Sequence, residues 1–369
     1  MRITCAKDLL LENLQTVLKT VATKSTMPVL SGIRIETKDD GRVEMASTDM
    51  ELSLRLTLEV KIEREGAAVA PGRLLTDVIK SLPSGEVSLD FDEKEQLMDV
   101  TSGSASFRLN CLPSADFPRL VEMPEGGAFE IDCKPLMDTI NTVARAASRD
   151  ETRPVLTGIL IKFSKEKVKM VATDSYRLSV CETKADTTLT DKKEVIVPRT
   201  SMEELARICG QVKPERVNVG LIDGQVIFSA GNIFLTSRLI EGQFPNYQQL
   251  LPEEFKHEIQ VDKEELLEVV ARIGLMAQKN APIKMKFDAG QLTVSAQTPQ
   301  VGEASESLAV AFQGEELEIG FNPEFLKDGI ESVGEQNVAL RIISPLRPGL
   351  LKGAGDDFLY LIMPVRLTG

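Results

Sequence analysis

The chain has 369 residues, 42% of them hydrophobic and 27% charged, a balance typical of a globular protein with two or three domains. No apolar run approaches the about 18 residues that span a bilayer, and the N-terminus lacks the apolar core of a signal peptide. The five cysteines are widely spaced and form no C-x-x-C pair, which argues against disulfides and zinc and favours a reducing cytoplasm.

The net charge is −13, and the sequence contains one histidine. An acidic chain argues against nucleic acid as a partner, because binding to DNA depends on neutralising phosphates. The charge is uneven, however: residues 1–125 carry −6, residues 126–251 carry +1 and residues 252–369 carry −8. A closed shape with a basic inner face and an acidic exterior would fit this distribution.

In chain order, each third of the sequence begins with apolar residues at helical spacing, which predicts amphipathic helices over residues 6–23, 134–148 and 263–277. A pair of strands follows each helix, as at Ile159–Phe163 and Val168–Ala172 in the second third. Another strand, a shorter helix and more strands come next. The shorter helices are predicted at Arg73–Leu82, Ser201–Cys209 and Glu324–Val333.

One signature occurs twice, at Thr26–Ser53 and at Thr152–Ser179. Each copy begins with Pro-Val-Leu-x-Gly, continues through two strands and ends on a Thr-Asp corner, and the copies are 126 residues apart. A recurrence at this period indicates that the chain is built from repeated modules.

Segments rich in Pro, Gly and acidic residues fall near Met123–Ala128 and Leu251–His257, and are predicted to be linkers. We therefore predict an α+β chain of three tandem modules, each with the order helix, strands, helix, strands. The predicted domains are residues 1–125, 126–251 and 252–369.

The sequence contains few signals that indicate an enzyme. It contains no G-x-x-x-x-G-K-[ST] motif and no G-x-G-x-x-G after a strand. His257 lies in an acidic linker, which favours a solvated loop residue over a catalytic base. Asp49 and Asp174 recur after equivalent strands, and this favours a structural turn over a metal site, because Asp readily bonds nearby backbone N–H groups. We expect no catalytic residue, no metal and no cofactor.

The C-terminal run Leu361–Leu367 is apolar almost to the end of the chain. It could pair as a last strand or, because Met and Pro accompany the aliphatic residues, form an adaptable pocket for a partner's apolar side chains. Basic residues occur around the ends of the predicted helices. If all the helices faced one space, these residues would form a diffuse lining suited to phosphates, without reading bases.

Seven short motifs occur in order along the chain. They are Pro28-Val29-Leu30, Thr48-Asp49, Leu112-Pro113-x-x-Asp116-Phe117-Pro118, Ala172-Thr173-Asp174-x-x-Arg177-Leu178, Val197-Pro198-Arg199, Gly242-x-Phe244-Pro245-x-Tyr247 and Met363-Pro364-x-Arg366-Leu367. Together with the threefold repeat, they make the chain resemble the bacterial DNA polymerase III beta subunits, the DNA sliding clamps. The resemblance covers essentially the full length.

The resemblance implies a head-to-tail homodimer that closes as a ring of six modules around duplex DNA, with helices inside and sheets outside. It implies a non-catalytic accessory subunit that tethers the replicative DNA polymerase and other replication and repair proteins to DNA, independent of base sequence. Weak, salt-sensitive phosphate contacts inside such a ring and acidic residues outside would suit sliding.

The resemblance also implies site residues. A pocket between the second and third modules would take a short peptide with Leu or Phe anchors from the polymerase, the clamp loader and other partners. Its implied residues are Leu156, Thr173, Asp174, Tyr176, Arg177, Leu178, Pro245, Gln249, Leu250, Leu361, Met363, Pro364 and Arg366. DNA contacts are implied at Lys24, Arg73, Asp150, Arg153 and Arg199. At the dimer seam, Phe107 of one subunit would meet Leu275 and Met276 of the other.

Two alternatives belong to other classes. One is an intracellular repeat scaffold that binds proteins only, against which the order of the motifs argues. The other is a metal hydrolase that uses Asp49 and Asp174, which would require bound metal in the purified protein.

Overall fold

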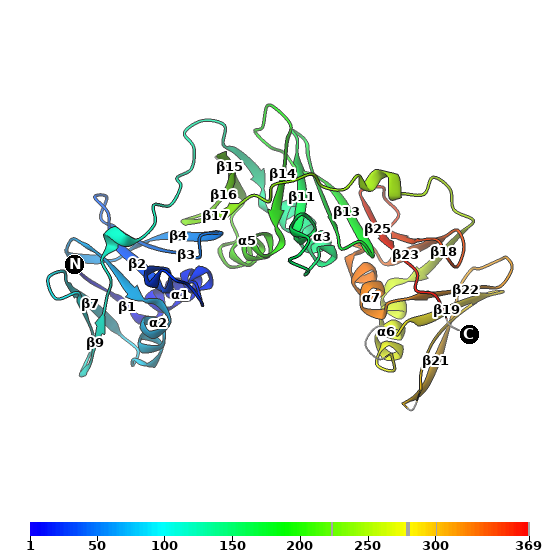
Figure 1. Cartoon of the computed structure of the whole chain (residues 1–369), viewed down its shortest axis with the longest axis horizontal. Coiled ribbons are helices and arrows are strands. Elements are labelled where there is room, and N and C mark those ends of the chain that lie inside the picture. Colours follow the sequence, from blue (N-terminus) through cyan, green and yellow to red (C-terminus); the bar gives the residue numbers. More distant parts are fainter. Residues whose placement is uncertain (223, 278–280, 300, 368–369) are drawn as a thin grey trace. The chain divides into compact units, whose positions relative to one another are not determined.

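The structure is a computed structural model that describes residues 1–222, 224–277, 281–299 and 301–367. The chain folds into two units (Figure 1). Unit 1 contains Met1–Ile131 and Arg207–Leu239, and unit 2 contains Asp132–Ala206 and Ile240–Gly369. Each unit has one eight-stranded sheet and one smaller sheet.

The predicted amphipathic helices are confirmed, although the first of each third ends early. The longer helices are α1 (Lys7–Val17), α2 (Gly72–Ser81), α3 (Cys133–Val143), α5 (Arg199–Val212), α6 (Lys263–Gly274) and α7 (Pro323–Ser332). Short helical turns are η1 (Leu18–Thr20), η2 (Pro28–Ser31), η3 (Ser114–Asp116), η4 (Ala144–Ala146), α4 (Pro154–Thr157) and η5 (Tyr247–Leu250). The hydroxyl of Thr20, at the end of η1, donates to the backbone oxygen of Ser47 on strand β3 (Arg42–Thr48), at 3.3 Å.

Unit 1 contains a five-stranded and an eight-stranded sheet. In spatial order the first is β5 (Lys61–Arg64), β1 (Arg2–Ala6), β7 (Glu86–Asp92), β8 (Leu97–Ser102) and β9 (Ala105–Asn110). The second is β10 (Phe129–Asp132), β15 (Arg216–Ile222), β16 (Gln225–Ala230), β17 (Ile233–Arg238), β4 (Leu52–Glu59), β3 (Arg42–Thr48), β2 (Gly32–Thr37) and β6 (Ala67–Pro71). The pairing of β17 with β4 joins segments about 180 residues apart in one sheet.

Unit 2 repeats this plan with an eight-stranded and a four-stranded sheet. The larger is β14 (Lys193–Pro198), β11 (Gly158–Phe163), β12 (Lys167–Thr173), β13 (Arg177–Lys184), β25 (Phe358–Ile362), β24 (Gly349–Lys352), β23 (Asn337–Ile342) and β18 (His257–Asp262). The smaller is β21 (Gly302–Ala309), β20 (Gln291–Thr298), β19 (Ile283–Asp288) and β22 (Leu317–Phe321). Here β13 pairs with β25, which brings the last strand beside the centre of the chain.

Each third opens with a strand rather than with the predicted helix, namely β1, β10 or β18. These strands have four to six residues and run directly into the helix without a Gly or Pro to separate them. The assignment of His257 to a solvated loop was wrong for the same reason. His257 begins β18, pairs with Ile342 and places its ring 5.3 Å from that of Phe312.

The glycine of the repeated Pro-Val-Leu-x-Gly signature allows close packing. A Cβ on Gly32 would lie 2.3 Å from Val69 Cγ1, and one on Gly158 would lie 2.5 Å from Ile196 Cγ2. In both copies the Pro-Val-Leu segment forms a helical turn, η2 or α4, and the glycine begins the next strand. The repeated motif therefore marks a point where this turn approaches the neighbouring strand too closely for a side chain.

The helices pack in pairs and on one face of the larger sheets. Within their own units, α1 packs on α2 and α6 packs on α7, and α3 lies on β12 and β13 (Figure 1). On the larger sheet of unit 2, the face opposite α3 carries a buried apolar cluster that includes Leu160, Val171 and Leu361. Phe244 and Tyr247, from the segment that leads to η5, cover part of that cluster.

Candidate functional site

A tight corner joins strands β12 and β13, and one carboxylate fixes its shape. The Asp174 Oδ1 atom accepts hydrogen bonds from the N–H groups of Tyr176 (2.9 Å) and Arg177 (3.0 Å). Ser175, at the tip, has a φ of 81°, in the left-handed region. Asp49 accepts the equivalent bonds at 3.0 and 2.8 Å. The predicted structural turn is confirmed at both aspartates.

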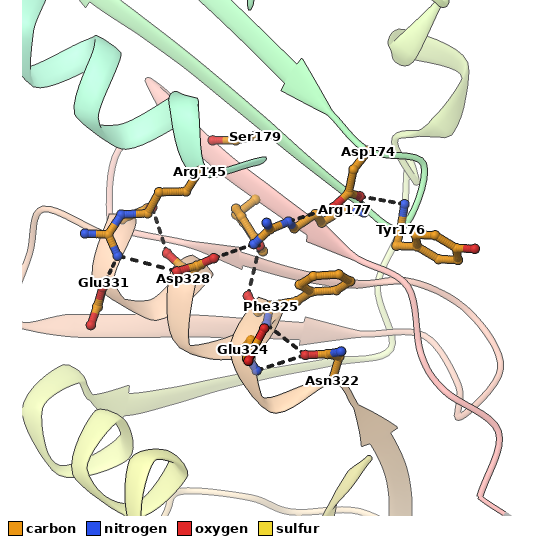
Figure 2. A network of polar contacts seen from close by, with 12 residues as sticks. Arg145, Asp174, Tyr176, Arg177, Ser179, Asn322, Glu324, Phe325, Asp328 and Glu331 are labelled. Carbon is orange, nitrogen blue, oxygen red and sulfur yellow. Dashed lines mark hydrogen bonds and ion pairs between the residues drawn. The ribbon is translucent and has the colours of Figure 1, made fainter. Parts of the chain in front are cut away.

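The side chain of Arg177 ties this corner to helix α7 (Figure 2). Its Nε donates to Asp174 Oδ2 (3.0 Å) and its Nη1 to Asp328 Oδ2 on α7 (2.5 Å). The same Nη1 is 3.3 Å from the Tyr360 hydroxyl, and the guanidinium lies 4.3 Å from the centre of the Phe325 ring. The guanidinium is therefore held by residues of the protein itself.

This network is largely removed from solvent. The Arg177 side chain is 10% exposed, and Tyr360 is fully buried. Burial alone would lower the pKa of Arg177, but the nearby Tyr360, Asp328 and Asp174 outweigh it and raise that pKa. Burial raises the pKa of Tyr360, whose hydroxyl donates to the backbone oxygen of Phe325 (2.9 Å). Both groups keep their ordinary protonation states at neutral pH, so the network is stable there.

Arg145 forms a second connection between α7 and the end of α3. It pairs with Asp328 Oδ1 (3.5 Å) and with Glu331, one turn farther along α7 (Figure 2). Asn322 caps the start of the helix, because its Oδ1 accepts from the N–H groups of Glu324 (2.9 Å) and Phe325 (3.2 Å). Helix α7 is thus fixed at its start and along its side.

A hollow of about 460 Å³ lies directly beside the corner. Eight of the residues implied for the peptide pocket line it: Thr173, Tyr176, Arg177, Leu178, Gln249, Leu250, Leu361 and Met363. Figure 2 shows the Tyr176 ring pointing away from the Arg177 network. Strand β13, strand β25 and the turn η5 therefore meet at this hollow, although they are far apart in sequence.

Large apolar side chains are exposed around the hollow. Tyr176 is 62% exposed, Leu250 54%, Leu346 67% and Met363 42%. Four such side chains at one concave place are typical of a surface that binds another molecule rather than water.

Five of the implied pocket residues do not line the hollow. Asp174 holds the corner beside the hollow by accepting a hydrogen bond from the Tyr176 N–H. Leu156, on α4, is buried at 9% exposure. Pro245, Pro364 and Arg366 lie elsewhere on the same unit. The hollow is also lined by six residues that the resemblance does not imply: Ser175, Leu251, Pro252, Leu346, Arg347 and Pro348. The last three belong to the connection between β23 and β24, for which the sequence contains no motif.

The residues implied for DNA contact differ in their surroundings. Lys24 and Arg73 are exposed and form no ion pair with any residue that the structure describes. Arg199 pairs with Glu203 (2.7 Å) at the start of α5. Arg153 pairs with Asp150 (3.1 Å) and donates to the Ser175 hydroxyl (3.0 Å), which places it at the pocket corner. Asp150 is therefore a partner of Arg153.

Arg73 lines a hollow of about 850 Å³ in unit 1, between α1, α2 and the end of α5. Lys19 and Arg207 line the same hollow, together with Glu12 and Asp77. Gln211 donates to Glu12 Oε1 (2.9 Å), so this carboxylate already has a partner. The helix faces of unit 1 thus present cations around a concave surface.

The implied dimer residues lie at sheet ends. Phe107 is 38% exposed on β9, the end strand of its sheet. Leu275, directly after α6, is 84% exposed, and Met276 beside it is half-buried. The Thr298 hydroxyl donates to the backbone oxygen of Met276 (2.6 Å), which places this segment beside the end of β20, where Thr298 pairs with Gly302 at the start of β21. Strand β21 is the end strand of the four-stranded sheet.

Among the described residues, no group of three or more His, Cys, Asp or Glu side chains is placed to hold a metal. No helix in the described part of the chain is both long and apolar enough to cross a bilayer.

Family models match the chain in three consecutive parts. Residues 1–121, 130–246 and 248–366 match the N-terminal, central and C-terminal domains of the DNA polymerase III beta subunit. The Beta sliding clamp of Bacillus subtilis (strain 168) is 32% identical, with 99% of this chain and 100% of the relative covered. The Beta sliding clamp of Streptomyces coelicolor is 31% identical, with 100% of both covered.

Solved structures agree over the same length. The DNA polymerase sliding clamp from Bacillus subtilis has a TM-score of 0.94 and 31% identity, with 100% of both chains covered. A sliding clamp from Pseudomonas aeruginosa bound to griselimycin has a TM-score of 0.92 and 30% identity, again with 100% of both covered. The chain therefore belongs to the bacterial DNA polymerase III beta subunit family, the DNA sliding clamps.

Proposed function

We propose that two copies of this chain join head to tail into a ring of six modules that encircles duplex DNA and slides along it. The modules are residues 1–125, 126–251 and 252–369. The observation that carries the proposal is the full-length agreement with sliding clamps in sequence and fold, at 32% identity and a TM-score of 0.94. The chain acts in the cytoplasm as a non-catalytic accessory subunit of DNA polymerase.

The charge of the chain suits a ring that holds DNA by enclosure. A protein of net charge −13 gains little from contact with a polyanion unless its cations are concentrated on one surface. Lys24 and Arg73, which form no ion pair with a described residue, and Lys19 in the same hollow as Arg73 supply such a surface on unit 1. Contacts of this kind bind phosphates weakly and are lost in salt, which allows sliding.

The end strands β9 and β21 support a head-to-tail dimer. Each is the last strand of its sheet, and a free strand edge is a site for pairing with another chain. Two charged residues of these edges are already paired within the chain, Arg108 on β9 with Asp99 and Glu306 on β21 with Arg272. Pairing β9 of one copy with β21 of the next would also bring Phe107 onto Leu275 and Met276.

The hollow beside Arg177 is the proposed docking place for partners. A short peptide with Leu or Phe anchors would cover the exposed Tyr176, Leu250, Leu346 and Met363. The replicative polymerase, the clamp loader and repair proteins are the proposed sources of such peptides. Griselimycin, bound in the similar structure from Pseudomonas aeruginosa, is proposed to bind this chain as well.

The test is retention on DNA of different topology. The chain is loaded onto a nicked circular plasmid with a clamp loader and ATP, and the plasmid is then cut at one site. A ring stays on the circle and is lost from the ends of the linear form. Equal retention on both forms would contradict enclosure, and no retention on either would favour the scaffold that binds proteins only.

A further inference from the structure

The sheet face that carries the partner hollow also carries a row of charged residues. Glu194, Lys162, Lys169 and Glu182 lie side by side in register across β14, β11, β12 and β13. Thr173, which lines the partner hollow, lies on the same face four residues farther along β12. At about 3.3 Å per residue, the row and the hollow are about 13 Å apart.

A second hollow of about 410 Å³ opens onto this row. Five lysines and two glutamates line it, so its charged lining carries +3 in a chain of net charge −13. We call the five lysines the lysine cluster: Lys162, Lys167, Lys169, Lys192 and Lys193.

The protein's own carboxylates satisfy only part of the lysine cluster. Glu194 pairs with Lys162 (2.8 Å), and Glu182 is shared by Lys167 (2.6 Å) and Lys169 (2.8 Å). Lys192 and Lys193 are exposed and form no ion pair with a described residue.

Lys162 and Lys169 stand directly opposite each other on neighbouring strands. Like charges in this position cost stability unless anions lie near them. Glu194 and Glu182 already supply such anions to Lys162 and Lys169, so the spare capacity of the cluster for further carboxylates lies at Lys192 and Lys193.

We infer that the lysine cluster is a second subsite for the peptides that dock in the partner hollow, and that it binds an acidic segment flanking the apolar anchor. The inference rests on the proposed partner docking. The apolar row between the two places, with Leu160 and Val171, is covered by Phe244 and Tyr247. A chain crossing this cover needs more than the about four residues of the straight path, so we expect the acidic residues about five to eight positions from the anchor.

Local charge favours an acidic peptide over a nucleic acid. A larger hollow of about 950 Å³ shares Lys167 and Lys192 with the lysine cluster and is also lined by acidic residues, among them Asp356 and Asp357. A continuous phosphate backbone would meet this repulsion, whereas two or three carboxylates fit within the lysine cluster. The anchor in the partner hollow would also hold them there at a high effective concentration.

The inference is tested by fluorescence polarisation with the full-length protein and labelled peptides. Each of the four peptides contains the anchor Leu-Ser-Leu-Phe, joined through a six-residue Gly-Ser spacer to four Glu or four Gln residues. The Glu or Gln residues stand on the N-terminal side of the anchor in one pair of peptides and on its C-terminal side in the other pair. Because each exposed ion pair contributes only a few-fold, we expect one Glu peptide to bind about five- to tenfold tighter than its Gln counterpart at low salt. The advantage should shrink as salt increases.

Two double variants assign the effect to the cluster. Lys192→Gln with Lys193→Gln should remove most of the advantage while leaving the Gln peptides unchanged. Lys61→Gln with Lys94→Gln removes the same charge from exposed positions of unit 1 and should leave the advantage intact.

The remaining outcomes are also decisive. Equal binding of all peptides would overturn the lysine subsite and leave the partner hollow standing. Failure of every peptide to bind or to be displaced by griselimycin would overturn the proposed docking itself, and the subsite with it. If the Lys192 and Lys193 changes weakened only a labelled single-stranded oligonucleotide, the cluster would be a phosphate site instead.

Discussion

Replacing Asp328 by Asn tests whether the largely buried ion pair between Arg177 and Asp328 contributes more to stability than an exposed ion pair does. Asp328 is the only carboxylate on α7 that contacts Arg177 within the described residues, and its side chain is 28% exposed. The change removes one charge and preserves the shape of the side chain. It leaves the Arg177 guanidinium, 10% exposed, with Asp174 and Tyr360 as its remaining polar partners.

The size of the effect follows from these remaining partners. Removing one member of a buried ion pair costs about 3–5 kcal/mol when the other charge is left alone. Arg177 keeps Asp174 at 3.0 Å and the stacked Phe325 ring, so we expect a smaller loss of about 2 kcal/mol in the free energy of unfolding. For a unit of about 200 residues this corresponds to a melting temperature lower by about 4–8 °C.

Glu331→Gln is the matched control. Glu331 lies one turn farther along the same helix and pairs with Arg145, but it has no contact with Arg177 among the described residues. Its partners Arg145 and Lys327 are 46% and 49% exposed, so the loss should stay below about 1 kcal/mol.

Calorimetry gives the stability, and polarisation with a labelled Leu-Ser-Leu-Phe peptide gives the affinity of the partner hollow. We expect Asp328→Asn to weaken both, because a loosened Arg177 no longer ties the corner at Ser175 to α7. In an Arg177→Gln background the same change should have little further effect on affinity. Equal losses of stability and affinity from Asp328→Asn and Glu331→Gln would refute this reasoning. Fully additive effects of Arg177→Gln and Asp328→Asn on affinity would refute it as well.

Three further predictions concern other parts of the chain. Phe107→Ala with Met276→Ala should shift the dimer toward monomer in sedimentation, whereas the exposed Leu9→Ala should not; an unchanged dimer would contradict the seam. Gly158→Ala should lower stability by about 1–3 kcal/mol in thermal unfolding, because the new Cβ meets Ile196 and Ile240, while Gly126→Ala, with open space around it, should be neutral. Burial raises the pKa of Cys5 to about 11 and that of Cys111 to about 12, so both thiols should resist DTNB at pH 8 in the folded protein. Because these folded-state values lie above the usual 9.0, unfolding should become easier as the pH rises from 9 to 11, and rapid labelling of the native chain would count against their burial.

Much of the fold could be predicted from the sequence, because the patterns that indicate helices and strands lie within short segments. The apolar spacing of α3 or α6 and the branched residues of β11 and β12 each lie within one short segment. Strand β18 was missed because its alternating residues, such as Ile259 and Val261, are few and continue straight into a helix. The recurring Thr-Asp corner was recognised as a turn because the Asp acts on residues two and three positions away.

The site was less accessible, because it depends on contacts between distant segments. Nothing local to Asp328 or Tyr360 indicates that they meet Arg177, about 150 and 180 residues away. Leu346 and Pro348 likewise line the hollow only because β24 lies beside β25. Motif resemblance identified the corner and the last strand, which have distinctive sequences, and missed the connection between β23 and β24, which does not.

The sheet pairings across modules determine where the chain can be divided. A cut after residue 125 would separate β4 from its paired strand β17. A cut after residue 251 would separate β13 from its paired strand β25. Each fragment would expose a long apolar strand edge, which is a template for aggregation. The three sequence repeats are therefore not three independently foldable pieces. Each unit takes segments from two separate parts of the chain, so no single cut follows the sheets, and the smallest chain expected to remain monodisperse is the whole one.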